Sequence, residues 1–545
     1  MSESKMNGAQ GLFKVLSDAG LDTCFANPGT SEMQLVYEVG KSENVRPILC
    51  LQENTVTGAA DGYARMTGKP AFTMLHVGGG FANSIANLHN AGRANTPMVN
   101  IVGANAAYHQ HNFPEHEMIG GKITDLARVV SHWTHEARSA DDLVRSGIEA
   151  VTVAKSKNGK ISTLVAPTNF HWEEISGVPS VQTEAETLKV SENTINDIVA
   201  RLNRGSKTAI ILGGTIALSH RGLELAAKVA SKTGAQLMSE TMAARMAQGE
   251  GTVTIPQVPY LVDLALDFFK GYEQVILIGA LKPVATFGYF KMPTLKIPSD
   301  CEVIDFASHE HDILDALDQL VTELDAQQQP IELQQRVEPT LPTGDITAQS
   351  VGQTLNLLMK QNSILVDESN TMGATILPEL DGAASHDYLY ASNGAAIGGG
   401  IPVALGASIA CPNRKTVLLQ ADGSAMYTNQ GLWSIARENC DVTILILKND
   451  EYAILNVELA RVRDDEANEK MLSMLKLDDP SIDWVQMGQS QGISSVSVHT
   501  NEALHDELSK AIAHKGPRLI EVNVKQNTQP FIDAVKEHSQ KLRAE

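Results

Sequence analysis

The sequence is poor in the features that mark secreted, membrane-spanning and nucleic-acid-binding proteins. Its cysteines are odd in number and lack the paired spacing of a zinc site or a disulfide framework: Cys24, Cys50, Cys301, Cys411 and Cys440. No run of about 18 uninterrupted apolar residues occurs, and the start of the chain lacks an apolar signal core. Lysine and arginine number 43 against 64 aspartates and glutamates, so the formal charge is −21. We therefore expect a cytoplasmic protein that binds neither nucleic acid nor a membrane.

The 545 residues, 43% of them hydrophobic, fall into three blocks. Two stretches rich in polar residues, near 174–193 and 325–344, lose hydrophobic periodicity and are typical of linkers. Within each block, short apolar runs alternate with amphipathic helices, which indicates parallel sheets covered on both faces. We expect an α/β protein of three doubly wound parallel-sheet domains, at residues 1–175, 190–328 and 345–545.

The third block contains a pattern of strand, loop, helix and strand. Buried strands are expected at 416–421 and 442–448, with apolar residues at helical spacing over 429–439 between them. Asp422 and Asn449 follow these strands and are 27 residues apart. A right-handed crossover brings the carboxyl ends of both strands to one sheet edge, so the two side chains are expected to converge there.

Carboxylate and amide oxygens suit an octahedral Mg²⁺ that also binds backbone carbonyls, water and phosphate. The small residues Gly423 and Ser424 would let backbone N–H groups approach a phosphate. The alternative is an ordinary polar loop after a strand.

These residues resemble the diphosphate-binding motif of the thiamine-diphosphate (ThDP) family that includes acetolactate synthase, pyruvate decarboxylase and benzoylformate decarboxylase. The family motif is Gly-Asp-Gly followed roughly 25 to 30 residues later by Asn. The resemblance implies that Asp422 and Asn449 ligate Mg²⁺ and that Glu451 adds its backbone carbonyl. The motif's first Gly is Ala421 here, and its Asn-Asn-Gly is Lys448-Asn449-Asp450. Neither departure removes a ligand.

The first block carries a second family signature, Glu53 followed by Gly58-Ala-Ala-Asp-Gly-Tyr-Ala-Arg. The resemblance implies that Glu53 hydrogen-bonds the aminopyrimidine of ThDP. A carboxyl group there can give and take a proton and so promote formation of the thiazolium ylid. The ylid attacks a 2-oxo acid, CO₂ departs, and the enamine is protonated or adds to a second carbonyl. Otherwise Glu53 is a helix N-terminal charge or a surface ion pair.

Two further segments of the third block resemble cofactor-binding loops of the family. In Ala391-Ser-Asn-Gly-Ala-Ala-Ile, the resemblance implies that Ile397 wedges between the cofactor rings and that Ala395 offers its carbonyl to the pyrimidine. Ile397 is otherwise a core residue. Ser369 and Asn370 follow a strand where relatives contact the diphosphate, although such residues also cap helices.

The residues that select the substrate are less clearly marked. His76 aligns with an active-site histidine of benzoylformate decarboxylase and Thr30 with its pocket serine, which implies proton transfer by the imidazole and carboxylate anchoring by the hydroxyl. His76 is otherwise a structural hydrogen-bonding residue. A loop with His109, His111 and His116 partly resembles the histidine pair of pyruvate decarboxylases, and a solvated polar loop is its alternative.

Three functions stay open. We favour a ThDP- and Mg²⁺-dependent lyase and carboligase that decarboxylates a 2-oxo acid and joins the product to an aldehyde acceptor. Shared segments at 25–33 and 452–462 resemble acetolactate-synthase-like large subunits, so acetolactate synthesis is the second, although the flavin fingerprint of true synthases is missing. A catalytically silent nucleotide-binding protein is the third. The resemblance also implies a homodimer or homotetramer with sites at the subunit interface.

Overall fold

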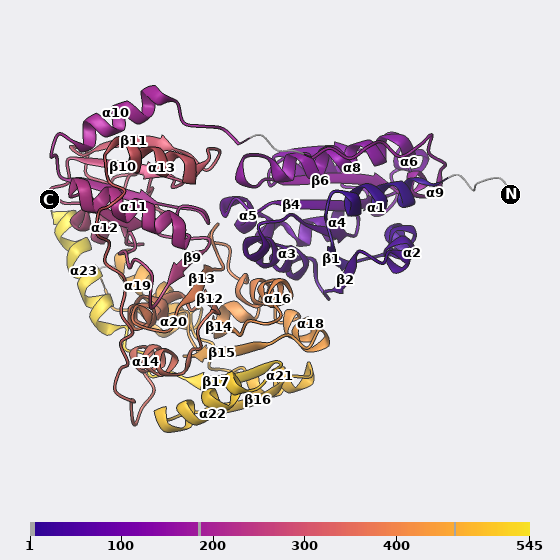
Figure 1. Cartoon of the computed structure of the whole chain (residues 1–545). Helices are drawn as coiled ribbons and strands as arrows, with labels where there is room; N and C mark the ends of the chain where they lie inside the picture. The colour runs from indigo at the N-terminus through magenta and orange to yellow at the C-terminus, as the bar shows by residue number, and fades with distance from the viewer. Residues whose placement is uncertain (1–5, 184–186, 463–464, 545) are drawn as a thin grey trace. The chain divides into compact units, whose positions relative to one another are not determined.

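The computed structural model describes residues 6–183, 187–462 and 465–544 (Figure 1). The chain divides into two compact units. Unit 1 comprises Met1–Leu188, Ala391–Arg414 and Thr428–Val442, and unit 2 comprises Lys189–Tyr390, Lys415–Tyr427 and Thr443–Glu545. Each unit is therefore assembled from segments that are far apart in the sequence.

Unit 1 contains a six-stranded parallel sheet of order β2-β1-β3-β4-β6-β5. Its strands are β1 (Thr23–Asn27), β2 (Arg46–Leu49), β3 (Ala71–Leu75), β4 (Met98–Ala104), β5 (Trp133–Glu136) and β6 (Ile161–Pro167). Its helices are α1 (Gly8–Asp18), α2 (Met33–Lys41), α3 (Glu53–Thr67), α4 (Val77–Asn83), α5 (Ile85–Arg93), α6 (Ala107–Gln110), α7 (Ile123–Ala127), α8 (Ala140–Lys155), α9 (Asn169–Trp172), α16 (Gly400–Ala410) and α18 (Gly431–Arg437).

Helix α16 packs closely along α3, and glycines on both helices make this approach possible. A methyl group at Gly62 would lie 2.1 Å from the carbonyl oxygen of Val403, and one at Gly406 would lie 1.8 Å from that of Ala59. Helix α16 is apolar on all sides and almost wholly buried, as expected for a helix enclosed by protein. Residues Gly58 and Gly62 of the family signature therefore serve helix packing.

Unit 2 contains a four-stranded parallel sheet and a seven-stranded sheet. The first has the order β11-β10-β7-β8, with β7 (Thr208–Leu212), β8 (Gln236–Ser239), β10 (Gln274–Ile278) and β11 (Glu302–Ala307). The second has the order β16-β17-β15-β14-β12-β13-β9, with β9 (Met246–Gln248), β12 (Ser363–Glu368), β13 (His386–Tyr390), β14 (Thr416–Ala421), β15 (Val442–Lys448), β16 (Ser494–Val498) and β17 (Arg518–Asn523). Strand β9 pairs antiparallel with β13 and is the exception to the expected parallel arrangement.

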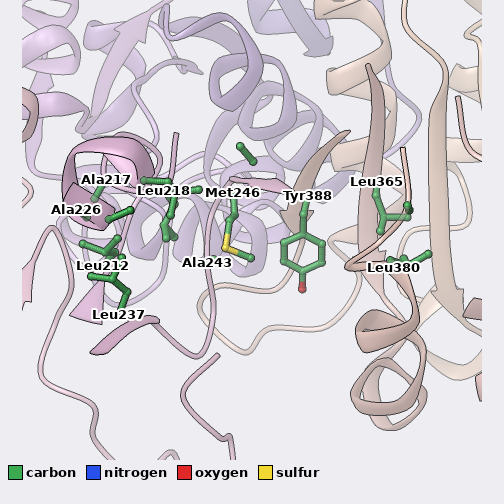
Figure 2. Packing of buried hydrophobic residues seen from close by; sticks show 14 of the residues in the cluster. Leu212, Ala217, Leu218, Ala226, Leu237, Ala243, Met246, Leu365, Leu380 and Tyr388 are labelled. Carbon is green, nitrogen blue, oxygen red and sulfur yellow. The ribbon is translucent and has the colours of Figure 1, made fainter. Parts of the chain in front are cut away.

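Helices of unit 2 surround these two sheets. They are α10 (Glu192–Leu202), α11 (His220–Thr233), α12 (Val262–Phe268), α13 (Ile313–Glu323), α14 (Ala348–Leu358), α15 (Gly373–Ile376), α17 (Asp422–Ala425), α19 (Ala453–Val462), α20 (Glu469–Leu472), α21 (Trp484–Ser490), α22 (Asn501–Ala513) and α23 (Gln529–Ala544). One apolar cluster runs from the four-stranded sheet past β9 to the seven-stranded sheet. Figure 2 shows this with Leu212 and Leu237 at one end, Met246 in the middle and Leu365 at the other.

The α/β class and the predicted strand, loop, helix and strand pattern are confirmed. Strands β14 and β15 have the expected bounds, and α18 lies between them in sequence. Apart from residues 184–186, which lie outside the described part, the first expected linker holds no helix or named strand until α10 begins at Glu192, and the second holds none. No helix of the described residues is both long and apolar enough to cross a membrane. All five cysteines are free thiols.

Candidate functional site

Glu53 is the first residue of α3, and its carboxylate faces inward. The residue is 7% exposed. The side-chain amide of Asn27 donates to Oε1 at 3.0 Å, and that of Asn83 donates to Oε2 at 3.2 Å. Asn27 ends β1 and Asn83 ends α4, so two elements hold the carboxylate at the carboxyl edge of the sheet. A surface ion pair or a simple helix N-terminal charge does not describe this arrangement.

His76 follows β3 and is paired with a carboxylate that the sequence did not single out. Its Nδ1 lies 2.8 Å from Oε2 of Glu32, which also accepts the Gly29 backbone N–H at 2.7 Å. Glu32 is fully buried, whereas the His76 side chain is 25% exposed. Burial raises the pKa of Glu32, and the hydrogen bonds from Gly29 and His76 oppose that rise.

The glycine-rich start of α4 brings the histidine and Glu53 to one wall. A methyl group at Gly80 would lie 2.9 Å from Oε1 of Glu53 and 3.3 Å from Cβ of His76, so only a glycine leaves this surface open. Val77, directly after the histidine, has φ of 40°, a left-handed conformation that strains a β-branched residue. The backbone is thus strained at the point where it presents His76.

The structure separates the three histidines of the predicted loop. The ring of His116 lies edge-on to that of His76, with ring centroids 5.3 Å apart. His109 and His111 are exposed, and the ring of His109 packs against Tyr108. Thr30 is also exposed, in the same turn as Glu32. Of the loop histidines, only His116 is in contact with His76 among the residues described.

The loop after β13 is fixed by polar side chains of α5. The side-chain amide of Asn90 donates to the Ala396 carbonyl at 2.7 Å, and its oxygen accepts the Gly394 backbone N–H at 3.0 Å. This holds Ala395, which is exposed, at φ of 61°. Ile397 is only partly buried, so it differs from the core residue that was its alternative.

In unit 2 the two strand ends meet, but Asn449 reaches the Asp422 carboxylate through its backbone. The side-chain amide of Asn449 donates to Gln526 at 2.7 Å, and its Oδ1 accepts the Glu451 backbone N–H at 3.2 Å. Oδ1 of Asp422 accepts the Gly423 backbone N–H at 2.8 Å, and Oδ2 accepts the backbone N–H groups of Asn449 at 3.1 Å and Asp450 at 2.9 Å. A methyl group at Gly423 would lie 2.6 Å from the Tyr452 ring, which explains the glycine after the aspartate.

The oxygen donors in this loop fit a hard divalent cation. Burial raises the pKa of both Asp422 and Glu451, so a nearby positive charge would relieve the cost of keeping these carboxylates ionised. No group of three or more His, Cys, Asp or Glu residues suited to a metal occurs in the described part of the chain. Any ion here would therefore rely on Asp422 together with amide and backbone oxygens, the set expected for Mg²⁺.

The departures from the family motif are accommodated locally. Ala421 has φ of −68°, which any residue adopts, so a glycine is not required. Asp450 has φ of 55°, the region that favours glycine, and aspartate is one of the residues that tolerates it. Lys448 Nζ lies 3.7 Å from Asp450 and 3.9 Å from Glu521, on a cavity of about 350 Å³, and no contact joins it to Asp422.

Of the residues expected at the diphosphate, Asn370 and Ser424 lie together, whereas the Ser369 hydroxyl is bonded within the fold. The Asn370 side-chain amide lies 3.4 Å from Ser424 Oγ, so these two are brought together. Gln420 donates to Ser424 Oγ at 2.8 Å and to Glu368 at 2.9 Å. The Ser369 hydroxyl donates to the buried Asp367 and is engaged within the fold.

Two glycine turns after strands of the four-stranded sheet are tight and leave little room for a dinucleotide. Gly214 and Gly279 both have φ of 68°. The Gly214 backbone N–H donates to a carboxylate oxygen of Glu240 at 2.7 Å. A methyl group at Gly213 would lie 2.6 Å from the Ala280 Cα. A carboxylate of the protein itself thus occupies the position where such a turn would bind a phosphate.

Sequence reasoning missed Glu32, Asn27, Asn83 and Asn90. Asn27 could have been found, because it is the last residue of a strand whose carboxyl end faces the site. Glu32 and Asn83 lie beyond strand ends, in a turn and at the end of a helix, and no spacing rule connects them to Glu53 or His76.

Two family models match the chain. The N-terminal TPP binding domain of thiamine pyrophosphate enzymes matches residues 6–128, and the C-terminal TPP binding domain matches residues 380–522. The matched ranges include Glu53 and His76 in the first case, and Asp422 and Asn449 in the second.

Relatives align over nearly the whole chain. IlvX of Mycobacterium tuberculosis, which carries the name of an acetolactate synthase large subunit, is 39% identical over 525 residues, with 95% of this chain and 99% of that protein covered. Benzoylformate decarboxylase of Pseudomonas aeruginosa is 24% identical, with 94% and 97% covered. The solved thiamine-diphosphate-dependent 4-hydroxybenzoylformate decarboxylase of Rhodococcus jostii RHA1 superposes with a TM-score of 0.83 at 22% identity, with 96% and 100% covered. This last likeness establishes the fold.

Proposed function

The chain belongs to the family of thiamine-diphosphate-dependent enzymes, and we propose that it is a 2-oxo acid decarboxylase with carboligase ability that uses ThDP and Mg²⁺. One observation supports this reaction type best. A buried carboxylate, Glu53, and a partly exposed imidazole, His76, border the same glycine, Gly80, at one sheet edge. Proton transfer at two positions, one on the cofactor and one on the product, requires such a pair.

Each half of the cofactor has residues suited to it. Glu53 would hold or move a proton at the pyrimidine, with Asn27 and Asn83 fixing its carboxylate. In unit 2, Asp422, Asn449 and the Glu451 carbonyl are our proposed Mg²⁺ ligands. When bound, ThDP supplies an electron sink for the carbanion left by the departing CO₂.

Further residues would shape the cofactor and grip its diphosphate. We assign Ile397 and the Ala395 carbonyl to the ring system, because Asn90 fixes their loop and Ile397 is not buried in the core. Gly423, Ser424 and Asn370 are assigned to the diphosphate through backbone and side-chain donors. Ser369 would contribute through its backbone, since its hydroxyl is occupied.

The substrate would bind beside His76. The imidazole would deliver a proton to the product carbon, and the exposed Thr30 hydroxyl would anchor the substrate carboxylate. Glu32 bonds both the turn that carries Thr30, through the Gly29 N–H, and the His76 ring at the end of β3. This shared partner supports the action of both groups on one substrate.

Acetolactate synthesis is the second candidate, because the 39% identical relative carries that name. The Glu240 carboxylate on the Gly214 N–H argues for an enzyme without the flavin of true synthases, but it does not decide between the two reactions. A silent binding protein is the weakest candidate, because Glu53, Asp422 and Asn449 are all present.

Product analysis separates these candidates. Purified protein would be incubated with ThDP, Mg²⁺ and a panel of 2-oxo acids, alone and with an aldehyde acceptor. An aldehyde as the product from the acid alone, and a hydroxyketone with the acceptor, are the expected results. Acetolactate from pyruvate would establish the second candidate, and absence of ThDP binding in calorimetry would eliminate both.

We further propose a cytoplasmic homodimer or homotetramer. Free thiols fit a reducing compartment, and α2 exposes Met33, Val36 and Tyr37 on one side, a surface that a second subunit could cover. Light scattering on the purified protein measures the subunit number directly, and a monomer with full turnover would rule out interface sites.

A further inference from the structure

Glu32 is an unusual residue because its carboxylate is fully buried and only half satisfied. Its Oε2 accepts the Gly29 N–H and contacts Nδ1 of His76, while its Oε1 has no hydrogen-bond partner in the described part of the chain. Leaving a buried carboxylate oxygen unpaired is costly, so a merely structural carboxylate would be expected to acquire a second donor.

The backbone around this pair is cleared by glycines. A methyl group at Gly103 would lie 1.6 Å from Oε1 of Glu32, and one at Gly29 would lie 2.3 Å from Nδ1 of His76. Each distance is too short for any side chain, and the Gly103 contact falls on the unpaired oxygen. Both positions therefore have to be glycine for the carboxylate and the ring to meet as they do.

The contact decides which end of the imidazole is free. With Nδ1 directed at the buried carboxylate, Nε2 is left for the exposed side of the ring. An ionised carboxylate accepts the Nδ1 proton and fixes the tautomer in which Nε2 carries a lone pair, the arrangement used wherever a carboxylate orients a histidine. The other titratable groups facing His76 are His116, edge-on to it, and Glu53 across Gly80.

We propose that Glu32 is the positioning residue for His76, holding its Nδ1–H so that Nε2 first takes up a proton from solvent and then delivers it to the product carbon. This inference rests on the proposed function for its catalytic meaning. Glu32 also binds the Gly29 N–H, so the same carboxylate fixes the turn that presents Thr30. Val77, the next residue after His76, is held in a strained left-handed conformation, which restricts the backbone that carries the histidine.

The first test is the state of the imidazole itself, and it needs neither substrate nor a variant of Glu32. Long-range ¹H–¹⁵N spectra of the ¹⁵N-histidine-labelled protein report the tautomer, and His76→Ala identifies the signal. We expect His76 to carry its proton on Nδ1 at neutral pH. A proton on Nε2 would overturn the inference whether or not the enzyme turns over.

The second test is kinetic. Glu32→Gln keeps the side-chain volume and an acceptor for Gly29, but it removes the charge. We expect kcat to fall about 10- to 100-fold with ThDP affinity unchanged, and the pH profile of kcat to lose the limb that His76→Ala also loses. Glu38→Gln, on the neighbouring α2 and 8% exposed, is the matched control and should behave as the wild type.

The outcomes separate this inference from the function on which it rests. If the wild type consumes 2-oxo acids and Glu32→Gln has the same kcat and pH profile, Glu32 does not position His76. If the wild type consumes none of them, the proposed function fails, and the tautomer measurement still decides the geometry. If Glu32→Gln folds poorly, Glu32→Asp takes its place. The shorter aspartate keeps the charge but moves it away from the His76 ring, so kcat should fall here too.

Discussion

Replacing Glu53 by glutamine should separate what this carboxylate does for the chemistry from what it does for the fold. The glutamine side chain has the same shape but offers one oxygen to the two amides that now donate to Glu53, those of Asn27 and Asn83. One hydrogen bond to a charged acceptor is therefore lost, which costs about 1.5–3 kcal/mol, and removing a charge that is 7% exposed offsets part of that cost.

The effect on turnover should be much larger. A glutamine amide does not exchange protons at neutral pH, and positioned general acid–base groups contribute about 10²- to 10⁴-fold to rates. We expect kcat of Glu53→Gln to fall by that factor at saturating ThDP and Mg²⁺. Asn83→Ala, which leaves the carboxylate but removes one donor, should lie between the variant and the wild type.

The assay is 2-oxo acid consumption, with ThDP binding by calorimetry and melting temperature measured on the same samples. Glu38→Gln is the control, because it also removes a buried carboxylate but one that lies outside the candidate site. A kcat for Glu53→Gln within about twofold of the wild type, at the concentrations that saturate it, would remove Glu53 from the mechanism.

Three other perturbations follow from the structure. Asp422→Asn should weaken ThDP binding in the presence of Mg²⁺ by at least about tenfold in calorimetry, because a neutral amide is a poorer ligand, whereas Lys448→Ala should leave it unchanged. Burial lowers the pKa of the fully buried His171 to about 4. Between about pH 6.5 and pH 4 the unfolded chain therefore binds a proton at this histidine that the native chain does not. The free energy of unfolding is highest above about pH 6.5 and falls as the pH is lowered towards 4. In His171→Leu the loss of unfolding free energy between pH 7 and pH 4.5, from urea titrations, should shrink by about 2 kcal/mol. Gly62→Ala should cost about 1–3 kcal/mol, seen as a lower melting temperature or insoluble protein, because its methyl group would meet the Val403 carbonyl, whereas Gly40→Ala in α2 meets no atom and should cost less.

The sequence located the half of the site that depends on strand ends. Asp422 and Asn449 could be paired because two buried strands, joined by one crossover, have their carboxyl ends at the same edge, and the structure keeps those strand bounds. The prediction needed only periodicity and chain direction, and no side-chain conformation entered it.

The residues around His76 could not be found in this way. Glu32 reaches the ring from a short turn, and which of His109, His111 and His116 meets it depends on the path of a loop without periodicity. The family signature after Glu53 has a largely structural role. Its Asp61 and Arg65 form a buried ion pair within α3, so most of the motif builds the helix that carries Glu53.

The division of the chain between two units bears on how the protein is made. Helix α3 is buried over Asn54–Met66, but α16, which packs along it, is translated more than 300 residues later. A nascent chain of the first 188 residues would therefore leave the ribosome with a glycine-lined helix face uncovered, in need of chaperone protection until residues 391–414 emerge. For the same reason, expressing residues 1–188 alone should yield an aggregating fragment, and a useful truncation must keep the later segments in place.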